Sequence, residues 1–492
     1  MRNARPAPRE NGLCFRMGAM RALAPPPAVV ELCRDLRAAG GRAFVVGGWV
    51  RDALADKPTL EVDLEVFGLA AERLRERLAA HGAVDTVGEA FTVYKLRLAA
   101  APELAAVDVT LPRRESKRGR GHRGFAVVGD PDLPPVEAAR RRDFTINAIS
   151  LDPLTGELVD PFDGRGDLAR RLLRAVDPAT FGDDSLRVLR AVQLAARFEL
   201  AIDPDTAALC RGVALDDLAA ERVWGEVEKW LRRAARLSIG WRAARELGVV
   251  ARLWPECQAL VGCEQEAEWH PEGDVWTHTG LVLDEAAGLA GGLDRARRLT
   301  LLVAAIAHDF GKPATTLRQA GRIRSPGHEA AGVAPAARWL DRLGLGRLDG
   351  YDARGQILAL VQHHLAPTHL WNSERRGDRV SDGAFRRLAL KVDPDLLHRL
   401  ALADTRGRPP APPAEAPDWL WRRMRELAVS DGAPPPLLLG RHLLALGLAP
   451  GPRLGEILRA VYELQLDGSV STLDEALAAG RELAARPTAE PG

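Results

Sequence analysis

Acidic side chains recur at every second position of one apolar segment. Glu61, Asp63 and Glu65 alternate with aliphatic residues, and this alternation predicts a strand over 60–67. Side chains at i, i+2 and i+4 of a strand project from one face. Carboxylates held this way repel one another unless water or cations surround them, so the pattern suits metal binding, with an exposed acidic edge strand as the simpler alternative. Asp108, on a later predicted strand, is a candidate third acid if the two strands pair.

Two glycines upstream of these acids suit a phosphate. Gly47 and Gly48 follow the predicted buried strand Ala43–Val46 and precede Arg51, which lies in a predicted helix. Glycines there let backbone N–H groups approach a phosphate, and a helix N-terminus favours the anion. Phosphoryl transfer requires both a phosphate cradle and metal-binding acids. The two features together therefore predict that class of reaction.

Arginine dominates the basic residues. The chain has 62 arginines and 6 lysines at a net charge of +1. Genomic base composition accounts for part of this excess, but local clusters remain: six basic residues face one acid between Arg113 and Arg123, and Arg140, Arg141 and Arg142 follow. Because the guanidinium fork matches phosphate geometry, we expect an anionic substrate near the first third of the chain.

Histidines gather in the second half, where eight of the 11 lie between His270 and His398. His308-Asp309 ends an apolar helical run, with His278 upstream and Asp404 downstream. Imidazole and carboxylate together suit a divalent metal that activates water for phosphoester hydrolysis.

Five segments carry a specific resemblance over about residues 40–230. They are Phe44-Val-Val-Gly-Gly-Trp-Val-Arg-Asp52, Val62-Asp-Leu-Glu-Val-Phe-Gly68, Arg141-Arg-Asp-Phe-Thr-Ile-Asn-Ala148, Asp160-Pro-Phe-Asp-Gly164 and Asp183-Asp-Ser-Leu-Arg-Val-Leu-Arg190. In order and spacing they resemble the motifs of class II tRNA nucleotidyltransferases, the CCA-adding enzymes and related bacterial poly(A) polymerases. The resemblance implies addition of nucleotides to a tRNA 3′ end from CTP and ATP without a nucleic-acid template.

The resemblance also implies roles for single residues. Its Asp-x-Asp metal pair falls on Glu61 and Asp63, so this chain departs from the family with a glutamate at the first position. The implied metal there is Mg²⁺. The implied nucleotide contacts are Gly48 and Arg51 for the triphosphate, Arg142 and Asp143 for ribose and phosphate, and Asp184, Arg187 and Arg190 for the base.

The base-contacting set also has a physical reading of its own. Asp184, Arg187 and Arg190 lie three residues apart on a predicted helix, hence nearly on one face. An Arg donor beside an Asp acceptor matches the edges of cytosine and adenine. Uracil and guanine invert that pattern and would leave buried groups unpaired, at about 1–3 kcal/mol each. A surface salt bridge is the alternative.

The histidine region has a second resemblance. The pattern His278…His308-Asp309…Asp404 resembles the HD metal-dependent phosphohydrolases and the HD region attached to many bacterial CCA-adding enzymes. It implies a divalent ion, Mg²⁺, Mn²⁺ or Ni²⁺, bound by these four residues. A degenerate HD fold that serves only as a tRNA-binding body is the alternative.

The 492 residues are enough for about three domains, and helical periodicity replaces strand patterns from about Asp167 onward. We therefore predict an α+β protein, in which a nucleotidyltransferase head with a small mixed β-sheet precedes an all-α body. The expected parts are a disordered extension (1–26), the head (27–165), a helical neck and RNA-binding body (166–270), the HD domain (271–410) and a helical tail (411–492). No apolar run is long enough for a membrane span, the five cysteines form no CxxC pair, and we expect a cytosolic protein.

The predicted function is CCA addition with a phosphohydrolase activity in the HD domain. A poly(A) polymerase or a C-only or A-only adding enzyme remains an alternative within the same class. A second alternative is a tRNA-binding protein with an inactive head and an active HD hydrolase. The glutamate at position 61, where the family has an aspartate, is the reason for this alternative.

Overall fold

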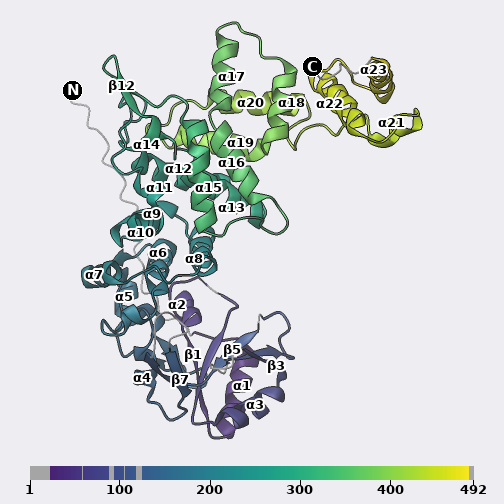
Figure 1. Ribbon diagram of the computed structural model, residues 1–492. Coiled ribbons are helices and arrows are strands. Elements are labelled where there is room, and N and C mark those ends of the chain that lie inside the picture. The colour runs from purple at the N-terminus through teal and green to yellow at the C-terminus, as the bar shows by residue number, and fades with distance from the viewer. Residues whose placement is uncertain (1–22, 58, 88–92, 105, 118–124, 487–492) are drawn as a thin grey trace, which may run out of the picture. The chain divides into compact units, whose positions relative to one another are not determined.

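The computed structural model describes residues 23–57, 59–87, 93–104, 106–117 and 125–486 (Figure 1). Residues 1–22 of the predicted disordered extension and part of the basic cluster Arg113–Arg123 lie outside these ranges. The chain divides into two compact units, one of residues 1–218 and 246–248, the other of residues 219–245 and 249–492. Each unit is described by itself.

The first unit is built on a seven-stranded mixed sheet with the order β3-β4-β5-β2-β1-β8-β9. Its strands are β1 (Arg42–Val46), β2 (Asp63–Phe67), β3 (Gly82–Val87), β4 (Val93–Leu98), β5 (Val107–Thr110), β8 (Ser150–Leu151) and β9 (Leu158–Val159). Strands β2 and β5 are parallel, and the other neighbours are antiparallel. The mixed sheet of the predicted head is confirmed.

Strand β1 is buried on both faces, which explains its continuous apolar sequence. Ala43 and Val45 contribute to a core that includes apolar residues of α1 (Pro27–Ala38) and α3 (Ala71–Ala79). Phe44 and Val46 face the opposite side, where they pack with Phe67 and with residues at α4 (Pro135–Arg140). Layers on both sides therefore fix the strand that leads into the Gly47-Gly48 turn.

Short elements complete the first unit. They are α2 (Gly48–Leu54), β6 (Arg113–Lys117), β7 (Phe125–Gly129), η1 (Thr145–Asn147), α5 (Gly164–Ala169), β10 (Leu172–Leu173), η2 (Phe181–Asp183), α6 (Leu186–Phe198), β11 (Ala201–Ile202) and α7 (Pro204–Gly212). Strands β6 and β7 form a hairpin, and β10 pairs with β11 in parallel. The pair β10–β11 lies in the region where the sequence showed no strand, because two residues are too few to set up an alternation.

The second unit is almost entirely helical, and the predicted all-α body is confirmed. Its helices are α8 (Ala220–Arg233), α9 (Leu237–Glu246, its last residue in the first unit), α10 (Val249–Leu253), α11 (Pro255–Gln258), α12 (Val275–Leu289), α13 (Arg295–Ala307), α14 (Lys312–Thr315), α15 (His328–Arg342), α16 (Ala353–His363), α17 (Ala366–Arg375), α18 (Asp382–Lys391), α19 (Pro394–Arg406), α20 (Glu415–Glu426), α21 (Gly440–Ala445), α22 (Pro452–Asp467) and α23 (Leu473–Ala485). Every residue of α13 from Leu299 to Ala307 is buried, which makes this helix the centre of the bundle. Helices α12, α16 and α19 pack against it.

One hairpin interrupts the helices of the second unit. Strands β12 (Leu317–Gln319) and β13 (Arg322–Arg324) pair around Ala320 and Gly321, which have φ angles of 51° and 77°. Two consecutive left-handed residues form the tight turn that hairpins favour. The sequence analysis did not predict this hairpin, because the strands have three residues each and are mostly exposed.

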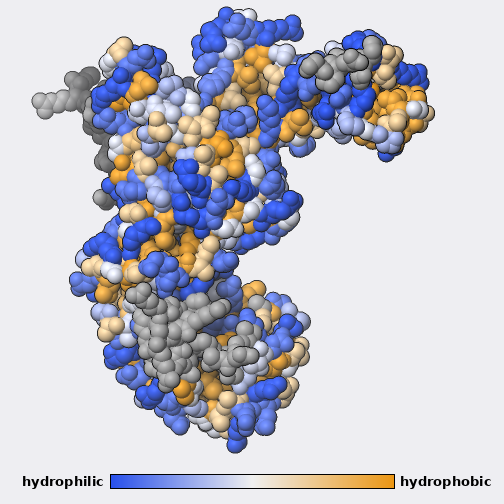
Figure 2. Space-filling view, viewed as in Figure 1, coloured by the Kyte–Doolittle hydropathy of each residue, from blue (hydrophilic) through white to orange (hydrophobic). Residues whose placement is uncertain are grey.

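The last three helices, α21 to α23, enclose a small apolar core of their own around Leu443, Ile457 and Val461. Figure 2 shows hydrophilic residues over much of the face in view, with apolar residues gathered over parts of the helical body as well as near α21. Within the residues that the structure describes, no helix has both the length and the apolar character needed to cross a membrane.

Candidate active sites

The predicted acids of the head meet at the middle of its sheet. Asp63 and Asp108 are register partners on the parallel strands β2 and β5. Glu61 is exposed and lies outside β2. The predicted strand 60–67 included Glu61, but β2 begins only at Asp63. Burial raises the pKa of Asp63, and the carboxylates of Asp108 and Glu61 raise it further. Oxygen donors that repel one another in this way fit a hard divalent cation such as Mg²⁺.

The glycine turn lies directly against this acid. Gly47 has a φ of 67°, which favours glycine. A Cβ atom added there would lie 3.4 Å from Nη1 of Arg142 and 3.7 Å from Oδ2 of Asp63. Gly48 begins α2, so the backbone N–H groups of the turn lie beside both an acid and a guanidinium. The structure thus brings together the predicted phosphate cradle, Asp63 and Arg142.

The acid Glu65 has a different environment from Asp63. It is buried, its Oε1 accepts a hydrogen bond from Arg141, and its Oε2 lies 3.4 Å from Nη2 of Arg142. Burial would raise the pKa of Glu65, but the two arginines outweigh it and lower the pKa. Glu65 therefore anchors the arginine pair beside the site.

Arg51 is engaged inside the protein. Its Nε and Nη2 donate to Oδ1 of Asp52 at 2.9 Å and 2.6 Å, and Nη1 donates to Oδ1 of Asn147 at 2.5 Å. Its guanidinium also lies 4.6 Å from the ring centre of Phe198. These bonds use three of the five N–H donors of the guanidinium, and a Cβ atom added at Gly48 would lie 3.6 Å from Nη2 of Arg51. Arg51 therefore supports the base of the glycine turn and keeps donors for an anion.

Asp143 is a buried hub behind the site. Its Oδ1 accepts from the backbone N–H of Phe144 at 2.8 Å and from Nδ2 of Asn147 at 2.9 Å, and its Oδ2 lies 2.9 Å from Nη2 of Arg190. Burial would raise the pKa of Asp143, but Arg190 and these hydrogen bonds lower it. The residue is therefore a carboxylate that joins α6 to the segment after α4.

The three predicted base-contacting residues do not share one helix face. Asp184 precedes the helix and accepts from the backbone N–H of Leu186 at 3.2 Å. Arg187, in the first turn of α6, donates to the carbonyls of Thr180 at 3.0 Å and Arg141 at 2.8 Å. Arg187 and Arg190 thus both reach the 141–143 segment, whereas Asp184 lies outside the helix that the spacing predicted.

In the second unit, the four predicted metal ligands converge from three helices. His278 lies in α12, His308-Asp309 follows α13, and Asp404 lies in α19; all four are buried. Nε2 of His278 lies 3.0 Å from Oδ1 of Asp404, and one ligand atom each from His278, His308 and Asp404 lie within 4.8 Å of one another.

Two further histidines belong to the same centre. Nε2 of His328, at the start of α15, lies 3.3 Å from Oδ1 of Asp309 and 3.2 Å from Nε2 of His364, which follows α16. Asp309, His328 and His364 form a second group with metal-ligand geometry. The sequence analysis did not select His328 or His364 as ligands. Both histidines lie at one end of a helix, as His308 does, and this shared placement was the sequence signal that could have identified them.

Backbone carbonyls orient three of these rings. The Nδ1–H of His308, His328 and His364 donates to the carbonyl three residues earlier, at 2.9 Å, 2.8 Å and 2.8 Å. Their Nε2 atoms are thereby turned toward the acids, as in metal sites whose ligand histidines are held by their other nitrogen. Among the described residues, the buried Nε2 of His308 has no hydrogen-bond partner, although Oδ2 of Asp309 lies 3.3 Å away. The donor set therefore fits a divalent metal.

The protonation states of the acids and of His364 suit a metal. In His278 and His328, by contrast, burial would lower the pKa, but hydrogen bonds to Asp404 and Asp309 outweigh it and raise the pKa. Burial would raise the pKa of Asp309, but His308 and Lys312 hold it well below its ordinary value. The pKa of Asp404 is likewise well below its ordinary value, because Arg408 and His278 outweigh burial. Burial and His308 lower the pKa of His364 to about 3. Both acids are thus charged, and His364 is neutral, as metal ligation requires.

A pocket of about 260 Å³ opens onto this centre. Its lining includes the acids Asp309 and Asp404, the basic side chains Lys312, Arg324 and Arg408, and the exposed Trp269 at its rim. Nζ of Lys312 lies 2.7 Å from both Oδ2 of Asp309 and Oε1 of Gln265. Cations around buried carboxylates suit an anionic substrate that approaches a metal.

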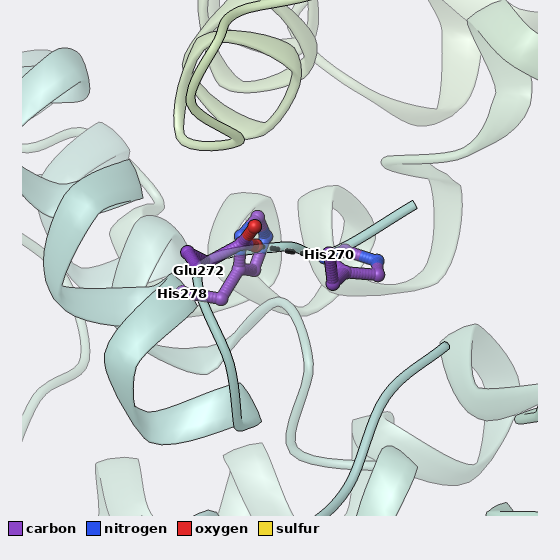
Figure 3. Close-up of side chains that lie close together, drawn as sticks. All are labelled: His270, Glu272 and His278. Carbon is purple, nitrogen blue, oxygen red and sulfur yellow. Dashed lines mark hydrogen bonds and ion pairs between the residues drawn. The ribbon is translucent and has the colours of Figure 1, made fainter. Parts of the chain in front are cut away.

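A third group lies behind His278. Oε1 of Glu272 lies 2.7 Å from Nδ1 of His278 and 2.8 Å from Nδ1 of His270 (Figure 3). Burial would raise the pKa of Glu272, but the hydrogen bonds with His270 and His278 lower it to about 2. Neither His270 nor Glu272 was predicted from the sequence.

Comparisons with known proteins match both regions of the chain. Residues 43–174 match the Poly A polymerase head domain family, and residues 275–405 match the HD domain family. A Multifunctional CCA protein of Xanthomonas campestris is 36% identical over 432 residues, which cover 85% of this chain and 96% of that protein. The Multifunctional CCA protein of Alkalilimnicola ehrlichii is 36% identical over 379 residues, 75% of this chain and 84% of that protein.

Solved structures share the fold. An apo CCA-adding enzyme superposes with a TM-score of 0.61 at 20% identity, over 94% of this chain and 96% of that one. The Bacillus stearothermophilus CCA-adding enzyme in complex with CTP gives 0.58 at 22% identity, over 93% of this chain and 98% of that one. With this architecture and the 36% identity over most of its length, the chain belongs to the family of the Multifunctional CCA proteins, CCA-adding tRNA nucleotidyltransferases with an HD domain.

Proposed function

We propose that the head of this chain adds C, C and A to the 3′ end of tRNA from CTP and ATP. The observation that carries the proposal is the meeting of Asp63, Asp108, the Gly47 turn and Arg142 at one point of the sheet. Solved relatives are described in complex with CTP, with ATP and with tRNA. In the reaction, the tRNA 3′ oxygen bonds to the α-phosphorus, the bond to the β-phosphate breaks, and pyrophosphate leaves.

Glu61 and Asp63, with Asp108 beside them, are the residues that would hold Mg²⁺. Two such ions would activate the 3′ hydroxyl and offset the charge on the leaving group. The backbone N–H groups of the Gly47-Gly48 turn and the guanidinium of Arg142 would bind the triphosphate. Asp184, Arg187 and Arg190 would select the base.

The test is nucleotide addition to a tRNA transcript that lacks its CCA end, with each NTP alone and with CTP and ATP together. CTP alone should extend the transcript by two nucleotides, and the terminal A should appear only after both cytidines. A long tail from ATP alone would identify a poly(A) polymerase, and a stop after CC or a requirement for a CC end would identify a partial enzyme. No extension in any mixture would overturn the proposal.

We also propose that the HD domain is a metal-dependent phosphohydrolase. The unpartnered, buried Nε2 of His308 beside two charged acids supports it. A divalent ion held by His278, His308, Asp309 and Asp404 would supply an activated water. Lys312 and Arg408 would bind the phosphate, because both cations line the pocket.

Hydrolysis of a panel of phosphomonoesters and phosphodiesters with Mg²⁺, Mn²⁺ or Ni²⁺ tests this second activity. Asp309→Ala should abolish hydrolysis and leave nucleotide addition unchanged, since Asp309 lies in the second unit and the acids of the head lie in the first. Hydrolysis that persists in the folded variant would show that another site, or a contaminant, is responsible.

A further inference from the structure

The two ring nitrogens of His278 have different partners. Nε2 lies 3.0 Å from Oδ1 of Asp404, and His278 forms a group with His308 and Asp404 that could hold a metal ion. Nδ1, on the other edge of the ring, lies 2.7 Å from Oε1 of Glu272. A neutral imidazole carries hydrogen on one nitrogen and a lone pair on the other. If Nε2 is the atom that faces a metal, Nδ1 must carry the hydrogen. Among the described residues Nδ1 makes no hydrogen bond of good geometry, and Oε1 of Glu272, 2.7 Å away, is an acceptor within its reach.

This arrangement differs from that of the neighbouring histidines. The Nδ1–H groups of His308, His328 and His364 each donate to a neutral backbone carbonyl. In His278 a carboxylate oxygen takes that position, 2.7 Å from Nδ1, whereas the carboxylate of Glu329 lies 3.6 Å from Nδ1 of His328. A carboxylate partner makes an imidazole a more basic ligand than a carbonyl does, and it adds a negative charge close to the metal.

Glu272 is held firmly in this position. Its side chain is 2% exposed, and its Oε1 also lies 2.8 Å from Nδ1 of His270. The ring of His270 meets the ring of His278 edge to face, with centres 4.8 Å apart. Figure 3 shows the carboxylate of Glu272 placed against the ring of His278. The contacts restrict both the side chain of Glu272 and the rotation of the His278 ring.

We propose that Glu272 is a positioning residue for the metal centre of the HD domain. It accepts the Nδ1–H of His278, selects the tautomer that presents Nε2, and strengthens the bond from that atom to a divalent ion. The inference rests on the proposed metal-dependent hydrolase function. According to this inference, Glu272, which contacts His278 on the side away from the metal, contributes to the metal affinity.

A separate metal site made of His270, Glu272 and His278 is the competing interpretation, because their ligand atoms lie within 4.8 Å of one another. In that case His278 would bind ions through both nitrogens and would have to lose its remaining ring hydrogen. The hydrogen-bonded arrangement needs no such anion. The two interpretations differ in stoichiometry, since only a separate site loses an ion when Glu272 is removed.

The experiment measures Ni²⁺ binding to the full-length chain by isothermal titration calorimetry. Glu272→Ala should weaken the affinity by about 10–100-fold at unchanged stoichiometry, as outer-shell partners of metal ligands typically do. Glu272→Gln should recover part of that loss, because the amide oxygen accepts the same hydrogen bond without a charge. Glu268→Ala is the matched control: Glu268 lies in the same loop, is exposed and pairs with Arg322 at 3.3 Å, so its affinity should not change.

Three results would overturn the inference. Unchanged affinity in Glu272→Ala would show that the acid contributes nothing, and loss of one bound ion at unchanged affinity would favour the separate site. If Glu272→Gln were no better than Glu272→Ala and both melted below Glu268→Ala, the residue would be structural only. Failure of the proposed hydrolase function has another signature: the unaltered chain and His308→Ala would then bind Ni²⁺ equally, and no metal centre would exist at these histidines.

Discussion

Asp63 of β2 and Asp108 of β5 are register partners on two parallel strands. Partners in adjacent strands point to the same face of a sheet, so the two carboxylates lie side by side although they are far apart in sequence. Lys95, the partner of Asp108 on β4, lies 3.5 Å from it and offsets part of the negative charge. Burial raises the pKa of Asp63, and the carboxylates of Asp108 and Glu61 add to the effect, so a cation bound here would offset unfavourable negative charge.

The first prediction concerns Asp108, which the strand pairing places at the metal site. Asp108→Asn should lower the single-turnover rate of nucleotide addition by at least about a hundredfold, because a displaced or missing metal ligand misplaces the reacting groups. Binding of tRNA, measured by filter retention, should not change. Asp85→Asn is the control, since Asp85 is an exposed acid of the same sheet that pairs with Arg97 at 3.1 Å. Equal rates in the two variants would remove Asp108 from the site.

The second prediction separates Glu65 from the other two acids of its segment. Glu65→Ala removes the buried carboxylate that Arg141 and Arg142 share. Breaking a buried pair in this way typically costs about 3–5 kcal/mol, so the variant should unfold at a clearly lower denaturant concentration. Glu76→Ala, on the exposed side of α3, should not. If Glu65→Ala were as stable as that control but inactive, Glu65 would be a metal ligand instead.

The sequence predicted the local elements of the head well, because their signals are local. The apolar run Ala43–Val46 became a strand, and so did residues 63–67 of the predicted strand 60–67. The three alternating acids did not share one role, since pairing with β1 and β5 begins only at Asp63 and since Arg141 neutralises Glu65. An alternation of polar and apolar residues predicts a strand, but it does not predict which residues from other segments will contact each side chain.

The same limit applies to the histidine centre. Its adjacent His308-Asp309 pair was recognisable, but His328 and His364 join it only through the packing of α15 and α16. Helix ends that are far apart in sequence lie together at Asp309, and the spacing of residues along the chain does not predict this proximity. Glu272 was missed for another reason: an acid in a polar loop resembles any solvated surface residue.

The third prediction uses two adjacent histidines. His364 is buried in the centre, 3.2 Å from His328, whereas His363 is half-buried and belongs to none of the metal-ligand groups found among the described residues. His364→Ala should lower both phosphoester hydrolysis and Ni²⁺ affinity by at least about tenfold, as loss of a metal-bound group does. His363→Ala should leave both within about twofold. Similar losses in both variants would indicate a general disturbance of α16.

The fourth prediction concerns acid stability of the metal-free chain. The pKa of Glu272 is about 2 in the folded protein, below its ordinary value of 4.5, since the hydrogen bonds from His270 and His278 outweigh burial. A lowered folded-state pKa contributes stability above the ordinary value, and that contribution disappears as the pH falls through the folded-state value. The stability difference between the unaltered chain and Glu272→Gln should therefore shrink steadily between pH 4.5 and about 2. Denaturant unfolding at several pH values measures it, and a difference that stays constant over this range would contradict the assignment.

The fifth prediction concerns Glu61, where the family has an aspartate. Glu61 is exposed and lies before β2, whose first residue is Asp63. The backbone N–H of Glu61 donates to Oγ1 of Thr59 at 3.2 Å. The carbonyl of the next residue, Val62, accepts from the backbone N–H of Asp108 at 3.2 Å, so the segment adjusts to the extra methylene mainly on its Thr59 side. A misplacement of a catalytic group by about 1 Å would cost about a hundredfold in rate.

We therefore expect Glu61→Asp to keep or raise the rate of nucleotide addition, because it restores the family's shorter ligand in a segment able to adjust. Glu61→Ala should abolish addition, because one carboxylate of the metal pair is then missing. The measurement is the single-turnover rate on the trimmed tRNA transcript, with Mg²⁺ varied. If Glu61 is a ligand, Glu61→Asp should also shift the Mg²⁺ concentration at half-maximal rate. Full activity in Glu61→Ala at every Mg²⁺ concentration would show that Asp63 and Asp108 hold the metals without it, and would place the metal pair across the two parallel strands.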